Sequence, residues 1–534
     1  MSVARRVSEI LDEHVTLTIE GIDRMYLNVY VPRLQSPEGV AAFFRFHRGH
    51  QYASSALMDP ISKSFVAAIE DLAAAEQIPL ITFRKGERKD DIAAEMRKSF
   101  ESDEGVVFIG KAQEKSSVFR TEKRTNPKTG FKYPWIVRGT AMVNQYYFYI
   151  VDRDFGPLFI KFGSYFPYTA KLYINGHEWL KRQLQQRDII HEGLDNGILS
   201  CADPVRVQQI ADSLSAEGID ALLRKWLGRL PHPFTAGDRE AGYRYDVSIL
   251  QAEFSRTMVL DRPVTGRVWF EEVIRENLDL GRPDQVQLIF DRRITKTTPG
   301  RFRTRVLTQG VIPSIHVHYK NTRIKEYYKE GRALRVETTI NDTRDFRIGK
   351  RLKNLPQLRE IGFAANRRLL DVQRISHDCA VGEDAWNAVV RPTQVGEQRA
   401  SALRFDDPRA QALFAAVLLF VFQVEGFASK ELRGPLAQLL GLDSASMTQA
   451  RMTYDLRRLR LHGIIERIPH THRYRVTPFG LRTCMFLSRT WGRLLRPGLS
   501  LLAPQAPGHP AQLSALFDKL DHAIEHFIKQ QKAA

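Results

Sequence analysis

Short apolar runs alternate with helical patterns through the first quarter of the chain. Residues 27–32, 78–83 and 105–110 are apolar runs of strand length, whereas residues 59–75 and 89–100 space their apolar positions as amphipathic helices do. The order strand, helix, strand, helix, strand is typical of an α/β unit with some parallel pairing. We therefore expect an α/β unit at the N-terminus.

The period of the pattern changes in the centre of the chain. Apolar and polar residues alternate over 304–308, 314–319, 323–328 and 334–340, and a short connection with Gly331 separates the last two segments. Alternation with a period of two indicates strands with one buried face, and the connection indicates a hairpin. The centre is therefore predicted to form an antiparallel sheet, with His316 and His318 on one face of a strand.

Helical spacing returns in the last third. Pro408 follows a capping Asp407, Gly441 and Gly463 are positioned as helix ends, and Ser444 is positioned as a cap. Three helices are predicted over 408–424, 430–440 and 444–462. Two short strands, 464–468 and 473–477, follow them, and a last helix begins at Pro478.

These patterns predict an α+β multidomain protein. The expected order is an α/β N-terminal unit, an aromatic-rich α+β unit, an antiparallel central sheet that is basic, a linker, a winged helix and a tail with a terminal helix. The corresponding boundaries are 1–130, 131–230, 231–380, 381–406, 407–500 and 501–534. The terminal helix over 511–531 is amphipathic and is a candidate for homo-oligomer formation.

The charge of the chain narrows the class of partner. The 534 residues contain 79 Lys and Arg against 61 Asp and Glu, a formal net charge of +18. Such an excess favours a polyanion, and nucleic acid before an anionic membrane. The longest apolar run, 412–422, is too short to span a bilayer. Three cysteines without paired spacing exclude a disulfide scaffold and fit a cytoplasmic location.

Two blocks carry the positive charge. Residues 291–353 contain 17 Lys and Arg against 6 Asp and Glu, and residues 451–500 contain 11 against 2. Arginine is more frequent than lysine in both blocks, and its planar guanidinium group suits bidentate hydrogen bonds to phosphate oxygens and guanine edges. The candidate nucleic-acid-binding residues are Arg323, Lys325, Arg335, Gln449, Arg451, Arg457, Arg458, Arg460, Arg473 and Arg475.

Three helices followed by a two-stranded hairpin resemble the winged-helix domain, over about 90 residues. The resemblance implies that the third helix enters a major groove while the hairpin contacts the DNA backbone. Thr448, Gln449, Arg451 and Met452 would then face the bases. A protein-binding winged helix is the competing interpretation.

The segment RIKEYYKEGRALRVETTIN, residues 323–341, resembles a hairpin of rolling-circle replication initiators. In that family, a His-hydrophobic-His motif on a neighbouring strand holds a divalent metal, and a tyrosine attacks a DNA phosphate. The resemblance implies a Mg²⁺ or Mn²⁺ site at His316, His318 and Glu337, with Tyr328 as a candidate nucleophile. The sequence departs from the family because no helix with a tyrosine and a nearby lysine follows.

The runs at 146–184, 194–197 and 334–346 resemble a widespread family of bacterial proteins associated with mobile elements. That resemblance implies a DNA-related role and names no site residue. The leading hypothesis is a DNA-binding protein. A metal-dependent nicking endonuclease and a structured-RNA-binding protein are the alternatives. A separate carboxylate set, Asp152, Asp154, Glu178 and Asp195, is a further metal-site hypothesis.

Overall fold

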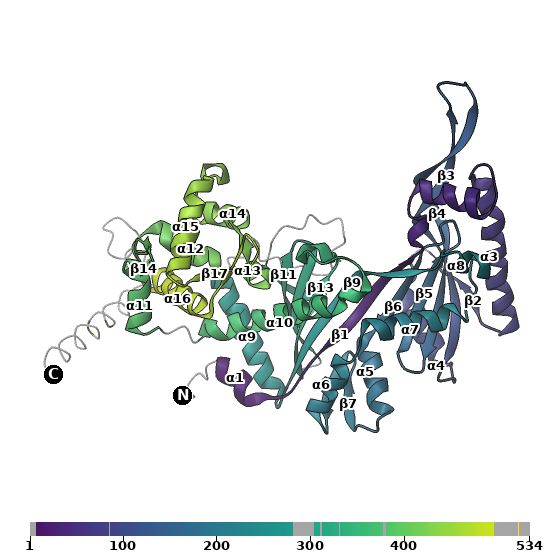
Figure 1. The fold of residues 1–534 in the computed structure, drawn as a ribbon. Helices are drawn as coiled ribbons and strands as arrows, with labels where there is room; N and C mark the ends of the chain where they lie inside the picture. Colours follow the sequence, from purple (N-terminus) through teal and green to yellow (C-terminus); the bar gives the residue numbers. More distant parts are fainter. Residues whose placement is uncertain are drawn as a thin grey trace.

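A computed structural model describes residues 7–84, 86–280, 304–309, 312–329, 332–377 and 381–495, together with 519 and 522. It contains one long sheet with helices on it and a largely helical C-terminal unit beside one end of that sheet (Figure 1). The predicted α+β class is confirmed. Among the described residues, none of the helices has both the length and the apolar character that a bilayer span needs.

The large sheet joins eleven of the described strands, and among these only the β2–β3 pair is parallel. From one edge to the other, the strands are β10 (Thr304–Gln309), β11 (Ile312–Tyr319), β12 (Thr322–Lys329), β13 (Ala333–Ile340), β9 (Asp246–Leu260), β1 (Val15–Tyr30), β6 (Ala170–Asn175), β5 (Gly156–Gly163), β4 (Lys132–Asp152), β3 (Gly105–Thr125) and β2 (Leu80–Thr82). The predicted central strands thus form one end of this sheet, and their antiparallel pairing is confirmed.

Strand β1 connects the two halves of the sheet. It pairs with β9 along its whole length and with β6 along its second half. Beyond the end of β6, helix α6 (Pro204–Asp212) covers the exposed edge of β1. There the Gln208 side chain accepts a hydrogen bond from the Glu20 backbone N–H and donates one to the Glu20 carbonyl. A side-chain amide therefore completes the backbone bonding that a neighbouring strand would otherwise supply.

Helices cover the apolar face of the sheet at both ends. Helix α3 (Ser55–Ala75) packs Phe65 against Phe162 and Tyr168 of the β5–β6 region. Helix α10 (Leu355–His377) lies on β9 and β13, where Phe363 meets Phe254 and Asn366 bonds to Thr338. The remaining helices of this part are α1 (Val7–His14), α2 (Pro37–Ala42), α4 (Lys89–Lys98), α5 (Gly176–Gln185), α7 (Ala216–Leu227), α8 (Ala236–Glu240) and α9 (Pro263–Leu280), and a hairpin is formed by β7 (His191–Leu194) and β8 (Gly197–Cys201).

The C-terminal unit has the predicted order of helices and hairpin. Its elements are α11 (Glu383–Val390), β14 (Thr393–Val395), β15 (Gln398–Ala400), α12 (Pro408–Val417), α13 (Phe420–Glu425), β16 (Phe427–Ala428), α14 (Ser429–Leu439), α15 (Gln449–Leu461), β17 (Ile465–Arg467), β18 (Arg473–Val476) and α16 (Pro478–Arg489). The helix expected over 408–424 is broken near Leu418, and Gln423 bonds to the carbonyl of Val417 beside the break. Thr448, rather than Ser444, caps α15.

Two of the expected boundaries do not separate units. The large sheet takes strands from the segments 1–130, 131–230 and 231–380, and the boundary at 130 falls inside the β3–β4 hairpin. The segment 381–406 is folded rather than a linker, because it contains α11 and the β14–β15 hairpin and buries Ala400 and Leu403. The terminal helix expected over 511–531 lies outside the described residues, apart from residues 519 and 522.

Arg473 ties the C-terminal unit to the sheet. Its buried guanidinium donates to the carbonyl of Gly426 at 2.7 Å, to Glu431 at 3.1 Å and to the Tyr319 hydroxyl of β11 at 3.1 Å. Arg473 was predicted to contact nucleic acid, and the structure places it in this internal junction instead.

Replacing Arg473 with methionine should therefore weaken the junction. The variant leaves Glu431 and Glu425 without their cation, and breaking a buried ion pair from one side costs about 3–5 kcal/mol. Hydrogen exchange of α14 and β18 should accelerate in Arg473→Met and not in Arg482→Met, where the arginine is exposed on α16. Equal exchange in the two variants would contradict the structural role of Arg473.

Candidate functional site

A band of polar side chains crosses one face of the sheet on β9, β13 and β12. On each of these strands the alternate residues face α10 and are mostly apolar, as with Phe254 and Val336. The residues between them point to the other face. Cross-strand pairing aligns Lys325, Glu337 and Ser255 on that face. Among the described elements, no helix covers the polar face at this point as α10 covers the other face, and α5 and the β7–β8 hairpin reach it from one side.

Arg335 lies at the centre of this band. The side chain is fully buried, and its Nη2 donates to Asp23 Oδ2 at 2.6 Å while its Nε donates to Glu337 Oε1 at 2.5 Å. Its Nη1 donates to the carbonyl of Asn196 in the turn between β7 and β8 and to the hydroxyl of Thr257 at 3.0 Å. One guanidinium therefore joins β13, β1, β9 and the β7–β8 hairpin. We call the group Arg335, Asp23, Glu337, Glu253 and Arg24 the Arg335 network.

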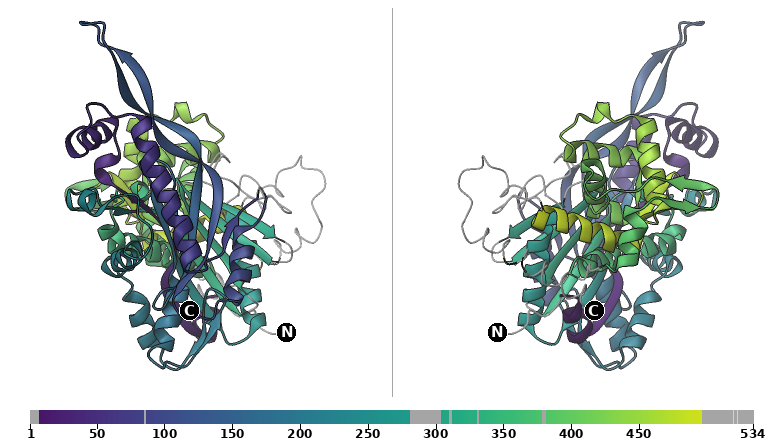
Figure 2. Two further views of the ribbon diagram at one scale, coloured as in Figure 1. Left: turned by 90° about the vertical axis from the view of Figure 1, so that its right-hand side faces the viewer. Right: turned by 90° about the vertical axis from the view of Figure 1, so that its left-hand side faces the viewer.

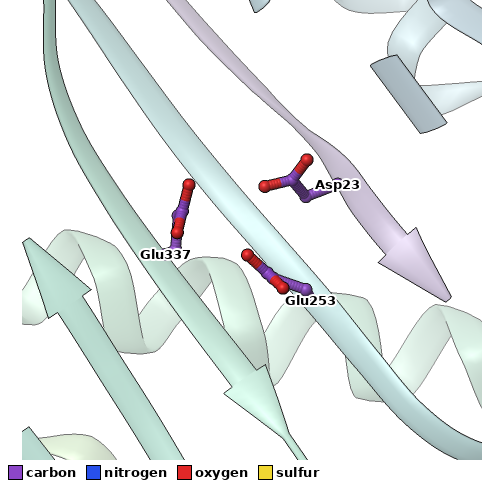
Figure 3. Close-up of side chains that lie close together, drawn as sticks. All are labelled: Asp23, Glu253 and Glu337. Carbon is purple, nitrogen blue, oxygen red and sulfur yellow. The ribbon is translucent and has the colours of Figure 1, made fainter. Parts of the chain in front are cut away.

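Three carboxylates meet in the Arg335 network (Figure 3). Asp23, Glu253 and Glu337 are all buried, and one oxygen atom of each lies within 4.8 Å of the others. An irregularity in the β1–β9 register between Ile22 and Arg24 falls at Asp23, beside Glu253 on β9. Among the described residues, this is the group of His, Cys, Asp and Glu side chains close enough to share one cation.

The charges of the network are balanced by arginines and by a proton. Arg24 lies 3.1 Å from both oxygens of Glu253, yet burial and the neighbouring Asp23 and Glu337 raise the pKa of Glu253 to about 8. Burial also works against ionisation of Asp23, but contacts with His177 and Arg335 outweigh it and lower the pKa of that carboxyl. With Glu253 protonated, two carboxylates face two arginines, and the buried group has no net charge.

His177 contacts the network from the first turn of α5. Its Nε2 lies 2.8 Å from Asp23 Oδ1, 2.8 Å from Arg335 Nη2 and 3.4 Å from Ser255 Oγ. All three neighbours approach the same ring nitrogen. An Asp–His–Ser relay needs its carboxylate and its serine on opposite ring nitrogens, so the arrangement does not make Ser255 a nucleophile. Burial lowers the pKa of His177, which favours the neutral imidazole.

The structure separates the residues predicted to form a metal site. Glu337 belongs to the Arg335 network, whereas His316 and His318 lie on β11, with β12 between them and β13. Two strand spacings amount to about 10 Å, which is too far for a shared ion. Tyr328 lies on the opposite face and donates to the carbonyl of Pro263 at 3.0 Å. The tyrosine on the same face is Tyr327, which donates to Glu337 at 2.7 Å.

The observed contacts favour a closed ion network over a metal-activated nucleophile. An oxygen of Asp23 and an oxygen of Glu337 are already bonded to Arg335, so a divalent cation there would compete with a fixed positive charge. Burial and Glu337 raise the pKa of Tyr327 above its ordinary value, which disfavours a tyrosinate at neutral pH. The other predicted carboxylate set does not join this group, and Asp152 accepts hydrogen bonds from Lys225 and Trp226.

The residues predicted to bind nucleic acid divide by burial. Arg335, Arg458 and Arg473 are buried, and Arg458 donates to the carbonyl of Ala402 next to the β14–β15 hairpin. The exposed members are Gln449, Arg451, Arg457 and Arg460, all on α15, and those of intermediate exposure are Arg323, Lys325 and Arg475. Met452, predicted to face bases, is buried in the core.

Sequence reasoning missed Asp23, Glu253 and His177. Their strands and helix are far apart in the chain, and no spacing rule brings residues 23, 177 and 253 together. One local signal is present, because Asp23 and Arg24 interrupt the apolar positions of β1 with two consecutive charged residues. Two adjacent charges in a long strand indicate a bulge or a buried pair.

Comparisons with known proteins found no match for this chain. No family model matches the chain, and no curated protein or solved structure matches it either. The resemblance to proteins associated with mobile elements and the resemblance to replication initiators therefore stay predictions.

The raised pKa of Glu253 makes stability depend on pH. Between about pH 4.5, its ordinary pKa, and about pH 8, the folded protein holds a proton that the unfolded chain has released. This contribution to stability is complete below pH 4.5 and is lost as the pH rises toward 8, at about 1.4 kcal/mol per pH unit. Relative to Glu253→Gln, the melting temperature of the wild type should fall between pH 5 and 8.

The control for that measurement is Glu122→Gln, which changes an exposed glutamate on β3. It should keep the pH profile of the wild type. Parallel profiles for the wild type and Glu253→Gln would contradict a protonated Glu253.

Proposed function

We propose that the protein binds duplex DNA through the exposed side of α15 and the β17–β18 hairpin. The observation that carries the proposal is a row of polar residues on that helix. Gln449, Thr453, Arg457 and Arg460 are exposed and lie 4, 8 and 11 residues from the first, which places them along one side of the helix. The neighbouring side of the helix holds Met452, Leu456 and Leu459 in the core.

The surroundings of α15 support a role in groove binding. Helices α12 and α14 precede it, and β17 and β18 follow it as an antiparallel hairpin, with β16 as a third strand. This order agrees with the winged-helix hypothesis, in which the third helix lies in a major groove. The N-terminus of α15 is exposed, begins after the Thr448 cap and carries Arg451 in its first turns. A helix N-terminus with a cation beside it attracts phosphate.

The charge of the exposed residues also supports the proposal. Arg458 and Arg473 are used internally, but Arg451, Arg457, Arg460 and Arg467 remain exposed on α15 and the hairpin. For Arg451 and Arg457 no ionic partner lies within the part of the chain that the structure describes. Exposed arginines without a carboxylate partner are well suited to neutralising the phosphates of a nucleic acid.

Duplex DNA fits better than duplex RNA as the partner. The major groove of B-DNA is about 12 Å wide and admits an α-helix, whereas the corresponding groove of A-form RNA is too narrow for side chains to read. A helix that presents glutamine, threonine and arginine offers the side chains that bond to base edges and phosphates.

Removing the two arginines without ionic partners should weaken binding and reduce its dependence on salt. In Arg451→Ala with Arg457→Ala, two phosphate contacts are lost, so the slope of log K against log salt should fall by about 2. Fluorescence anisotropy with a labelled 30-base-pair duplex of mixed sequence, measured over a salt series, gives both the affinity and the slope.

The matched control is Arg153→Ala with Arg206→Ala, two exposed arginines of the other half of the chain. This variant should bind like the wild type. An unchanged affinity and slope in the α15 variant would exclude α15 as the DNA-binding surface.

A further inference from the structure

The β3–β4 hairpin extends beyond the sheet as a two-stranded arm. Strand β4 pairs with β5 only as far as Gln145, but its pairing with β3 continues to the Thr125–Lys132 pair. The arm projects away from the rest of the molecule as a twisted ribbon (Figure 2). We call residues 120–138 the arm.

Far out along the arm, Tyr133 stacks on Tyr52 with ring centroids 6.5 Å apart, but most of the packing of the arm against other described elements is at its base. Phe119 and Ile136 are buried there, and Ser55 at the start of α3 bonds to Thr121. From Glu122 to Thr125 and from Lys128 to Lys132 every residue is exposed. The length of the arm therefore adds little to the hydrophobic core, and its sequence is not explained by folding alone.

The arm is strongly basic. It contains six Lys and Arg against one glutamate, Glu122. Glu122 lies 3.4 Å from Arg120, and the Arg124 guanidinium lies 5.2 Å over the Trp135 ring. No ionic partner for Lys123, Lys128 or Lys132 occurs among the described residues. The net charge counted over a longer segment of the sequence does not reveal this positive charge, because the residues on either side of the arm are close to neutral.

An exposed aromatic ring lies at the tip of the arm. Phe131 is 57% exposed and follows the turn at residues 126–130. More than half of the Phe131 surface contributes nothing to the stability of the fold, because that apolar area is not removed from water. Proteins that bend DNA insert apolar side chains of this type between base pairs, with flanking cations on the phosphates.

The dimensions of the arm suit a groove of duplex DNA. At about 3.4 Å per residue, the paired strands span about 17 Å from Arg120 to Thr125. That length equals about half a turn of B-DNA. A two-stranded ribbon is narrow enough to enter a groove. The lysines would also attract an acidic protein. Attraction to an acidic protein does not explain the exposed aromatic residue at the tip of the ribbon, whereas insertion between base pairs does.

We propose that the arm is a second DNA-contacting element, which sets Lys123, Lys128 and Lys132 on phosphates and inserts Phe131 at a base step. This second proposal rests on the proposed function only in taking DNA as the polyanion. None of the residues of the arm belongs to α15. Two linked surfaces on one duplex raise the overall affinity above that of either surface alone. The arm and the α14–α15 region reach the same upper side of the molecule in Figure 1.

The lysines and the phenylalanine have separable tests with the full chain. Lys123→Ala with Lys128→Ala and Lys132→Ala should lower the affinity for a 40-base-pair duplex by about tenfold or more at low salt and reduce the salt slope by about 2–3. Phe131→Ala should leave the salt slope unchanged. It should remove the rise in fluorescence of 2-aminopurine placed along the duplex, because that probe reports unstacking. The variants change exposed side chains, so their melting temperatures should match that of the wild type.

Comparison with the α15 double variant separates the two proposals. Loss of affinity in the arm variant alone supports the arm and overturns the α15 surface, and loss in the α15 variant alone does the reverse. If a single strand of equal length depends on the arm lysines and the duplex does not, the duplex assignment is overturned. Wild-type affinity and an unchanged 2-aminopurine signal in both arm variants would overturn the arm proposal entirely.

Discussion

The pairing of β1 with β9 is the constraint on which the rest of the structure depends. Strand β1 pairs with β9 over its full length, and these two strands join the β10–β13 end of the sheet to the β2–β6 end. The irregularity in their register at Asp23 places a carboxylate beside Glu253, where like charges would repel. The raised pKa of Glu253, which keeps that carboxyl protonated, removes the repulsion. Arg335 on β13 pairs with Asp23 and at the same time holds the β7–β8 turn against the sheet.

The Arg335 network illustrates the difference between charge in a sequence and charge on a surface. Residues 291–353 are the more basic of the two blocks, yet Arg335 is buried in ion pairs and Lys325 and Arg323 are only partly exposed. Burial also lowers the pKa of the Lys325 ammonium, which Glu337 opposes. The polar band of the sheet is therefore nearly neutral. Exposed cations of the same block, such as Lys320, Arg344 and Arg347, lie outside this band.

Local patterns predicted much of the secondary structure. Period-two alternation identified β11, β12 and β13, and capping residues identified the start of α12, both ends of α14 and the C-terminal end of α15 within a few residues. Glu337 was predicted to hold a metal with His316 and His318, whereas in the structure it lies in the Arg335 network, two strands away from both histidines. Alternation places Tyr328 and Glu337 on opposite faces once their strands are paired, and the register that decides this is a long-range property.

Longer-range features escaped prediction for a similar reason. The units expected at 1–130, 131–230 and 231–380 share one sheet, because β9 returns to pair with β1 after more than two hundred residues. Asp23 and Glu253 meet through that pairing, and His177 reaches Asp23 from α5, which follows β6 on the other side of β1. The arm was missed because residues 120–130 are almost all polar and lack the apolar alternation by which a strand is recognised.

An internal ion network and two exposed basic elements have separate roles in this protein, and hydrogen exchange of the full chain with and without a duplex tests that separation most directly. A 40-base-pair duplex at low salt should slow exchange in α15, the β17–β18 hairpin and the outer part of the β3–β4 hairpin. Exchange in β13 and β9 around Arg335 should stay unchanged. Protection confined to the polar face of the sheet, with none at α15, would contradict the account.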